Sequence, residues 1–186
     1  MISTSSSSAQ ATLCLVWLHC VSPQILKGYQ ALLRVHGTIH SASNGKQTFF
    51  EMLHLTDPLF SKLGPRLKVV AIVDPAVDRA QAALEKKRDS FVVSAYQGTC
   101  TFKTFQGFIQ QMTPKDRPHA VIIGSPPMFR GSIHVGRDIE LQILKELPGV
   151  ALFVEKPVAT GPQEEIQDGF QIAKAISDAK AICSVG

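Results

Sequence analysis

The sequence contains no apolar run long enough to cross a membrane. Its most apolar early segment, ATLCLVWLHCV, covers only residues 11–21, whereas a membrane-spanning helix needs roughly 20 residues. No lysine or arginine precedes this segment, so it also lacks the positive region with which secretory signal peptides begin. We therefore expect neither a membrane protein nor a secreted one.

Cysteine is scarce, and the four cysteines show none of the spacings that build a metal site or a disulfide framework. Cys14, Cys20, Cys100 and Cys183 form no CxxC pair. Four of the six histidines are irregularly spaced between residues 19 and 54, with no matching pair of carboxylates. We expect reduced thiols, a cytoplasmic location and no metal site.

Runs of like charge are absent as well. The 19 lysines and arginines and the 15 aspartates and glutamates are scattered along the chain, which gives a formal net charge of +4. Proteins that bind nucleic acid usually concentrate Lys and Arg on one face, often among aromatic residues. The charge pattern therefore predicts no nucleic-acid partner, although a modest positive field suits a cofactor that carries phosphate.

The composition itself is that of a globular α/β protein. Hydrophobic residues make up 45% and charged residues 18% of the 186 residues, which is enough for one domain with a sizeable core. Residues 1–61 have no clear hydrophobic period. The stretch 2–8 is rich in Ser and Thr, and we predict that it forms a disordered N-terminal end. We interpret residues 1–61 as an irregular N-terminal segment.

From residue 66 onward, apolar strands alternate with amphipathic helices. The strands are predicted at 66–74, 90–96, 117–124, 150–154 and 180–186, and the helices at 75–89, 101–112, 133–147 and 160–178. The last helix is expected to be capped by Thr160. Strands and helices that alternate in this way form a doubly wound parallel sheet, because each parallel crossover requires a helix. We therefore assign residues 62–186 to an incomplete Rossmann-like α/β domain, in which ligands bind beyond the carboxyl ends of the strands.

The first predicted strand ends in Asp74, directly before Pro75. An acid at this position of a dinucleotide-binding fold can accept hydrogen bonds from the ribose hydroxyls of the adenosine, and it repels the 2′-phosphate of NADP. Spacing alone is equally consistent with an aspartate that caps the following helix. Arg79 lies about one helical turn further on and could accommodate a 2′-phosphate, so both NAD and NADP stay open.

Two other strand ends carry chemistry. Gly124, Ser125, Pro126 and Pro127 form a turn of small and rigid residues that a flat ring or a ribose can approach closely, although such turns are common. At the end of the strand VALFV, Lys156 stands between Glu155 and Pro157. Its ammonium can hydrogen-bond a substrate oxygen, with Glu155 to orient it and Pro157 to fix the backbone. On its own, this tripeptide is also consistent with a surface salt bridge.

Together these three strand ends resemble one family. A strand that ends in Asp-Pro, the stretch HAVIIGSPP, and a strand that ends in Glu-Lys-Pro before a helix are similar, in order and spacing, to the Gfo/Idh/MocA family of NAD(P)-dependent oxidoreductases. The stretches GSPPMFRG and VALFVEKPVATGP look most like those of filamentous-fungal members. The resemblance implies a cofactor-binding site formed by Asp74, Gly124 to Pro127, Glu155 and Lys156, with Lys156 beside the nicotinamide as the residue that assists proton transfer.

The resemblance has two departures. Members open with a Gly-rich GxGxxG turn that holds the pyrophosphate, but no such motif precedes Leu67. Members also continue into an α+β domain that supplies the substrate pocket and the surface for oligomerisation, and we expect no such domain here because the sequence ends at Gly186. The sequence therefore supports two hypotheses. The first is an oxidoreductase that acts on a hydroxyl or carbonyl of a small molecule, as in fungal specialised metabolism. The second is a truncated, inactive remnant that associates with itself or with a full-length homologue.

Overall fold

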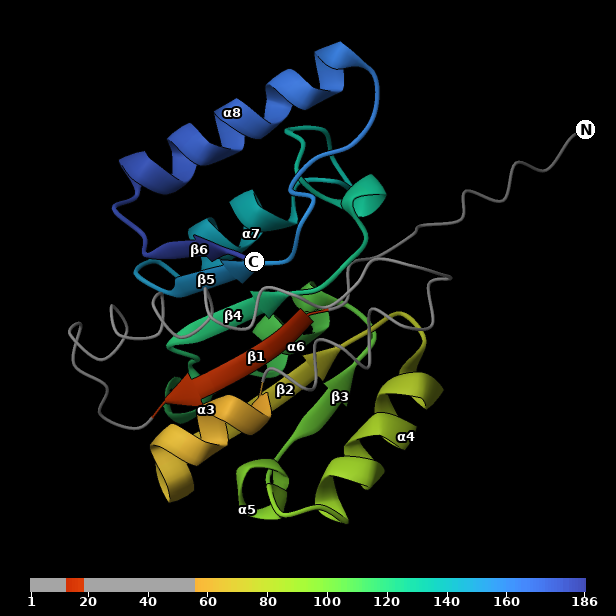
Figure 1. The fold of residues 1–186 in the computed structure, drawn as a ribbon, viewed down its shortest axis with the longest axis vertical. Coiled ribbons are helices and arrows are strands. Elements are labelled where there is room, and N and C mark those ends of the chain that lie inside the picture. The colour runs from red at the N-terminus through yellow and green to blue at the C-terminus, as the bar shows by residue number, and fades with distance from the viewer. Residues whose placement is uncertain (1–12, 19–55) are drawn as a thin grey trace, which may run out of the picture.

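The computed structural model describes residues 13–18 and 56–186 (Figure 1). The stretch at 2–8 that was predicted to be disordered lies outside the described residues. The described helices are α3 (Thr56–Leu63), α4 (Val77–Arg88), α5 (Val93–Tyr96), α6 (Phe105–Gln111), α7 (Ile139–Glu146) and α8 (Gln163–Asp178). The strands are β1 (Leu13–Leu18), β2 (Leu67–Val73), β3 (Cys100–Phe102), β4 (Ala120–Ile123), β5 (Ala151–Val154) and β6 (Cys183–Val185).

Within the described residues, the strands form one six-stranded sheet in the order β3-β2-β1-β4-β5-β6. This is the strand order of a Rossmann fold. β2 pairs with β3, β4 with β5, and β5 with β6, all in parallel. The predicted doubly wound α/β fold is therefore confirmed.

β1 is the exception to the predicted parallel arrangement, because it runs antiparallel to both β2 and β4. Leu13 pairs with Val73 on one side and with Ile123 on the other. This strand comes from the N-terminal segment for which the sequence pattern predicted no strand. It occupies the place of the first Rossmann strand but points the opposite way.

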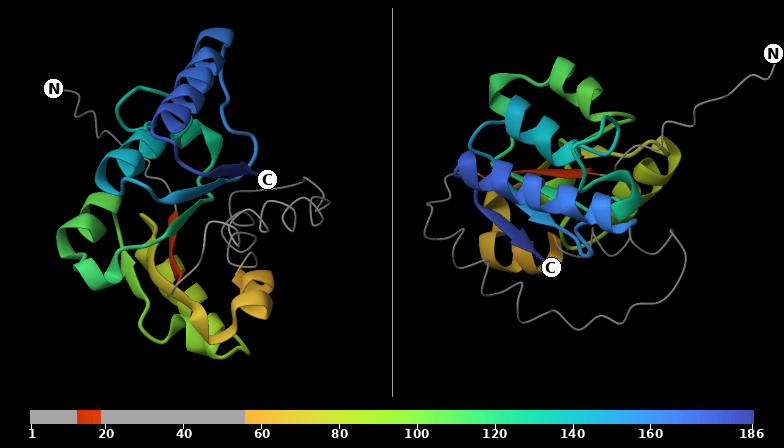
Figure 2. Two further views of the ribbon diagram at one scale, coloured as in Figure 1. Left: turned by 90° about the vertical axis from the view of Figure 1, so that its left-hand side faces the viewer. Right: turned by 90° about the horizontal axis from the view of Figure 1, so that it is seen from above.

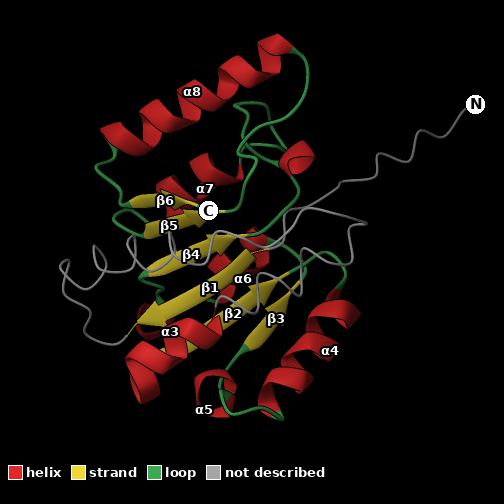
Figure 3. Ribbon diagram, in the orientation of Figure 1, coloured by secondary structure: helices red, strands yellow, loops and turns green. Residues whose placement is uncertain are grey.

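Two apolar cores lie on the two faces of the sheet, and neighbouring residues of β4 alternate between them. The ribbon views show helices on both faces (Figures 2 and 3). In β4, Ile122 packs into the first core with α3, α4 and α5, while Val121 and Ile123 pack into the second core with α6, α7 and α8. Each face of the sheet is thus covered by helices, as an α/β sheet requires. None of the described helices has both the length and the apolar character needed to cross a membrane.

The segment 90–96 was predicted to be a strand, and this prediction was wrong. It forms a turn followed by the short helix α5, and the neighbouring strand is β3, several residues later. Val92, Ala95 and Tyr96 are buried, whereas Phe91 and Val93 are exposed. Buried residues at positions i, i+3 and i+4 follow the period of a helix, so the β-branched pair Val92-Val93 was misleading.

Three helix starts also differ from the sequence prediction. α6 begins at Phe105, where the hydroxyl of Thr104 accepts a hydrogen bond from the Gly107 amide at 3.0 Å. α7 begins at Ile139, and Ile133, predicted to face inward, is 41% exposed. α8 begins directly after Pro162, so Thr160 does not cap it. For α7 and α8, the loop at the carboxyl end of the preceding strand is therefore longer than predicted.

Candidate functional site

The sequence-predicted residues meet at one edge of the sheet. Val73 pairs with Phe102, and Val154 pairs with both Ile123 and Val185, so all five parallel strands end at this edge. Asp74, the turn 124–127 and the tripeptide 155–157 follow three of these strands. We call this side of the sheet the carboxyl edge.

The tripeptide that contains Lys156 is held by its backbone. The Glu155 amide donates to the Ile123 carbonyl at 3.0 Å, and the Lys156 amide donates to the Gly186 carbonyl at 2.8 Å. The peptide bond between Lys156 and Pro157 is cis. The Lys156 side chain is exposed, so a fixed backbone presents its ammonium at the carboxyl edge.

The turn after β4 supplies a buried hydroxyl. Ser125 is 1% exposed, and its Oγ has no hydrogen-bond partner in the part of the chain that the structure describes. A buried polar group without a partner costs free energy that a ligand atom can recover. Gly124 is buried and the two prolines are half-buried. This turn and Lys156 therefore fit the nicotinamide and ribose end of a dinucleotide.

Asp74 lies at the same edge but is already engaged. Its side chain is 0% exposed, its Oδ1 accepts a hydrogen bond from the Ala76 amide at 2.7 Å, and both carboxylate oxygens lie 2.8 Å from Nη2 of Arg79. The Arg79 side chain is 37% exposed. The Asp74–Arg79 pair, rather than Asp74 alone, thus faces the region where an adenosine ribose would bind, and the role of Asp74 as ribose acceptor stays a prediction.

The pyrophosphate part of a dinucleotide fits the described residues less well. Because β1 is antiparallel, the chain enters it at the carboxyl edge at Leu13 and leaves it at the opposite edge after Leu18. β1 therefore does not end at the carboxyl edge, where a Rossmann fold holds the pyrophosphate at the turn after its first strand. The described residues contain no Gly-rich turn at the carboxyl edge that could replace it.

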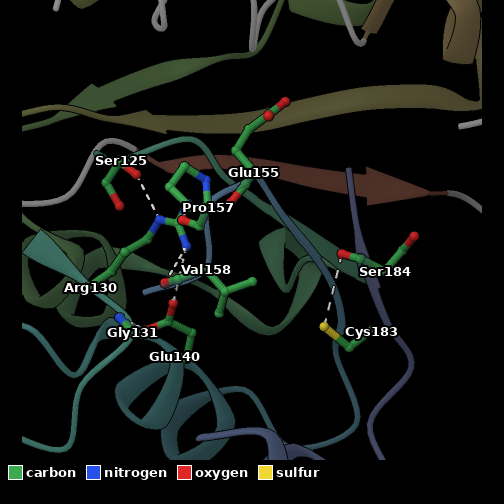
Figure 4. A network of polar contacts seen from close by, with 9 residues as sticks. All are labelled: Ser125, Arg130, Gly131, Glu140, Glu155, Pro157, Val158, Cys183 and Ser184. Atoms are coloured by element: carbon green, nitrogen blue, oxygen red, sulfur yellow. Dashed lines mark hydrogen bonds and ion pairs between the residues drawn. The ribbon is translucent and has the colours of Figure 1, made fainter. Parts of the chain in front are cut away.

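Sequence reasoning missed the buried polar network that supports this edge (Figure 4). The Arg130 side chain is 0% exposed and lies 3.9 Å from Glu140, whose side chain is equally buried. The other carboxylate oxygen of Glu140 accepts a hydrogen bond from the Gly131 amide at 3.2 Å. One signal could have revealed Glu140, because in α7 it stands in line with the apolar residues Ile143 and Leu147. No local pattern marks Arg130 as buried.

Burial shifts the pKa values of Arg130 and Glu140 in the same network in opposite directions. Burial lowers the pKa of the Arg130 guanidinium, and the negative charges of Glu140 and Glu155 act against this shift. Burial raises the pKa of the Glu140 carboxyl above its ordinary value, while backbone N–H groups and Arg130 partly oppose the rise. The charge of Glu155, expected to balance Lys156, thus also acts on Arg130.

The raised pKa of Glu140 predicts a pH dependence of stability. As pH rises from the ordinary pKa of a glutamate to the raised pKa of Glu140, the unfolded chain releases a proton that the folded chain retains. The free energy of unfolding should then fall, by up to about 1.4 kcal/mol per pH unit. Glu140→Gln should remove this slope in urea unfolding measured at several pH values. Glu146→Gln, which changes a partly exposed glutamate of the same helix, should retain it; equal slopes in wild type and Glu140→Gln would contradict the prediction.

Comparisons with known proteins agree with this geometry. The family described as "Oxidoreductase family, NAD-binding Rossmann fold", the Gfo/Idh/MocA family, matches residues 47–186. Two uncharacterized proteins of Schizosaccharomyces pombe are each 35% identical over 126 residues, which is 67% of this chain and 32% and 30% of theirs. The chain thus spans about a third of the length of these curated relatives. The comparison with solved structures found no significant match.

The family match covers all three strand ends on which the sequence resemblance rested. It also covers β2 to β6, the strands that form the carboxyl edge. The chain belongs to the Gfo/Idh/MocA family of oxidoreductases, and its residues 47–186 correspond to the NAD-binding Rossmann fold of that family.

Proposed function

We propose that the carboxyl edge binds the nicotinamide end of NAD or NADP and supports an oxidation or reduction at a hydroxyl or carbonyl carbon of a small molecule. The bound cofactor would supply C4 of its nicotinamide as hydride acceptor or donor. The observation that carries the proposal is that Lys156 and Ser125 follow neighbouring strands at one edge of the sheet, and that the buried Ser125 hydroxyl has no hydrogen-bond partner among the described residues. The substrate class, including a metabolite of fungal specialised metabolism, is part of this proposal.

Lys156 has the central role in the proposed reaction. During oxidation of an alcohol, the hydride would pass from the alcohol carbon to C4 of the bound nicotinamide, and the hydroxyl proton would pass to the side-chain nitrogen of Lys156. During reduction, the ammonium of Lys156 returns that proton to the carbonyl oxygen. The backbone bonds of Glu155 and Lys156 to neighbouring strands would hold the side chain in one position during this transfer. Ser125 would bind the nicotinamide ribose or amide through its buried hydroxyl.

A deuterium-transfer experiment tests the reaction directly. The chain would be incubated with NADH or NADPH that carries deuterium at C4, together with small sugar-like and aliphatic carbonyl compounds. The proposed function predicts an alcohol product that has gained a deuterium at the former carbonyl carbon. Oxidation of the cofactor without deuterium in any product would argue against a hydride transfer at this site.

The Asp74–Arg79 pair should govern the choice between the two cofactors. Asp74→Asn should weaken the repulsion of a 2′-phosphate and the binding of ribose hydroxyls, so the ratio of the Kd for NADPH to the Kd for NADH should fall. Arg79→Ala should raise the same ratio, since it removes a cation that pairs with Asp74. Each change should be about tenfold, the effect of roughly one good charge-assisted hydrogen bond. Fluorescence titration measures both constants, and parallel shifts in the two variants would contradict this role.

A further inference from the structure

Arg130 connects the two loops that carry the proposed cofactor contacts. Its Nε donates to the carbonyl of Ser125 at 2.7 Å. Its two terminal nitrogens donate to carbonyls of the segment after β5: Nη1 to Val158 at 3.0 Å, and Nη2 to Pro157 at 3.0 Å and to Glu155. Figure 4 shows the guanidinium between the Ser125 turn and this segment.

The accepting carbonyls lie on both sides of Lys156. Glu155 and Pro157 are its immediate neighbours, and both carbonyls bind the same nitrogen of Arg130. The Arg130 side chain is 0% exposed, so a guanidinium that lost these acceptors could not replace them with water and would be left desolvated. The position of the backbone at Lys156 is therefore tied to the position of Ser125.

We propose that Arg130 is a positioning residue, which fixes the backbone of Lys156 relative to Ser125 and so places the two groups for one ligand. The proposal rests on the proposed function for the roles of Lys156 and Ser125, but the positioning itself can be measured without any cofactor. A planar guanidinium with five N–H groups can bind several carbonyls at once, whereas a lysine ammonium is a compact charge with three donors. Arg130→Lys thus keeps the charge near Glu140 but loses the shape that joins the loops.

A matched control is available in the same loop. Arg137 also binds the segment after β5, since it donates to the Thr160 carbonyl at 3.3 Å and pairs with Glu165 at 2.7 Å. Its contacts lie beyond Lys156 and flank it on one side only. Arg137→Lys therefore repeats the substitution without removing a contact next to Lys156.

The first measurement is amide hydrogen exchange of the chain without cofactor, resolved by NMR. In Arg130→Lys, the amides of Glu155 and Lys156 should exchange about tenfold faster or more, while the Asp89 amide, which binds the Glu85 carbonyl at the end of α4, should keep its rate. Arg137→Lys should leave the Lys156 amide unchanged. An unchanged Lys156 amide in Arg130→Lys, or an equal rise at Asp89, would overturn the proposal. If Arg130→Lys does not fold, Glu140→Gln should show a smaller rise confined to the same two amides, and no rise there would overturn it.

The second measurement is a double-mutant cycle on the Kd for NADH. Arg130→Lys should weaken NADH binding about tenfold when Lys156 is present. The same substitution should weaken binding clearly less in a Lys156→Ala background, because the displaced loop then carries no ammonium that could be misplaced. Equal losses in the two backgrounds would show that Arg130 does not act through Lys156. Absence of saturable NADH binding by the wild-type chain would count against the proposed function, while hydrogen exchange would still decide the role of Arg130.

Discussion

Replacing Lys156 with alanine is expected to slow hydride transfer by a factor of about 10² to 10⁴, the usual contribution of a positioned proton donor or acceptor. The substitution removes the exposed ammonium at the end of β5, while the backbone bonds of residues 155 and 156 to their neighbouring strands do not involve this side chain. The fold should therefore persist. The rate of deuterium transfer in a single turnover, with the cofactor and substrate pair that supports the reaction, measures the effect.

The control for this substitution is Lys145→Ala, which removes an 82% exposed lysine from α7. Lys145 lies outside the carboxyl edge, so the transfer rate of this variant should equal that of the wild type. The Kd for NADH should change much less than the transfer rate in Lys156→Ala, because binding also uses other groups. A rate that is unchanged in Lys156→Ala, or lowered as strongly in Lys145→Ala, would contradict the assigned role.

Replacing Gly131 with alanine is expected to lower the free energy of unfolding by about 2–5 kcal/mol. Gly131 has a φ of +72°, where a side chain costs about 1–2 kcal/mol. A Cβ atom here would also lie 2.1 Å from the carbonyl oxygen of Val158. This oxygen accepts a hydrogen bond from Arg130, so relief of the contact must displace the bonded segment, at a further cost of about 1–3 kcal/mol. Urea unfolding measures the loss.

Gly136 provides the matched control in the same loop. Its φ is +88°, and a Cβ atom there would meet nothing within 4 Å. Gly136→Ala should therefore cost only the backbone term of about 1–2 kcal/mol. Equal losses of stability in the two alanine variants would contradict the expected clash between a Cβ atom at position 131 and the Val158 carbonyl.

Much of the sheet could be predicted because buried parallel strands are continuous apolar runs. β2, β4 and β5 are such runs. Each can therefore be recognised in the sequence without knowing which strands it pairs with. The direction of β1 could not be predicted in this way, since an apolar strand has the same pattern whether it runs parallel or antiparallel. The prediction of a strand at 90–96 was wrong for a related reason. Two adjacent valines favour a strand locally, but the packing of Val92, Ala95 and Tyr96 into the first core favours a helical turn.

The candidate site was predictable to the same extent. Asp74, Ser125 and Lys156 could be found because each lies within two residues of the end of a strand, and the carboxyl ends of parallel strands meet at one edge. The engagement of Asp74 by Arg79 and the burial of Arg130 depend on which groups surround these side chains in space. The carbonyls that accept hydrogen bonds from Arg130 belong to two separate loops, and no periodic sequence pattern connects these loops.

The most direct test of the central claim is a fluorescence titration of the folded chain with NADH and NADPH. We predict saturable binding of at least one reduced cofactor, weakened by Ser125→Ala and by Lys156→Ala but not by Lys145→Ala. Absence of saturation with both cofactors, or saturable binding that none of the carboxyl-edge substitutions weakens, would contradict the assignment of the cofactor site to this edge.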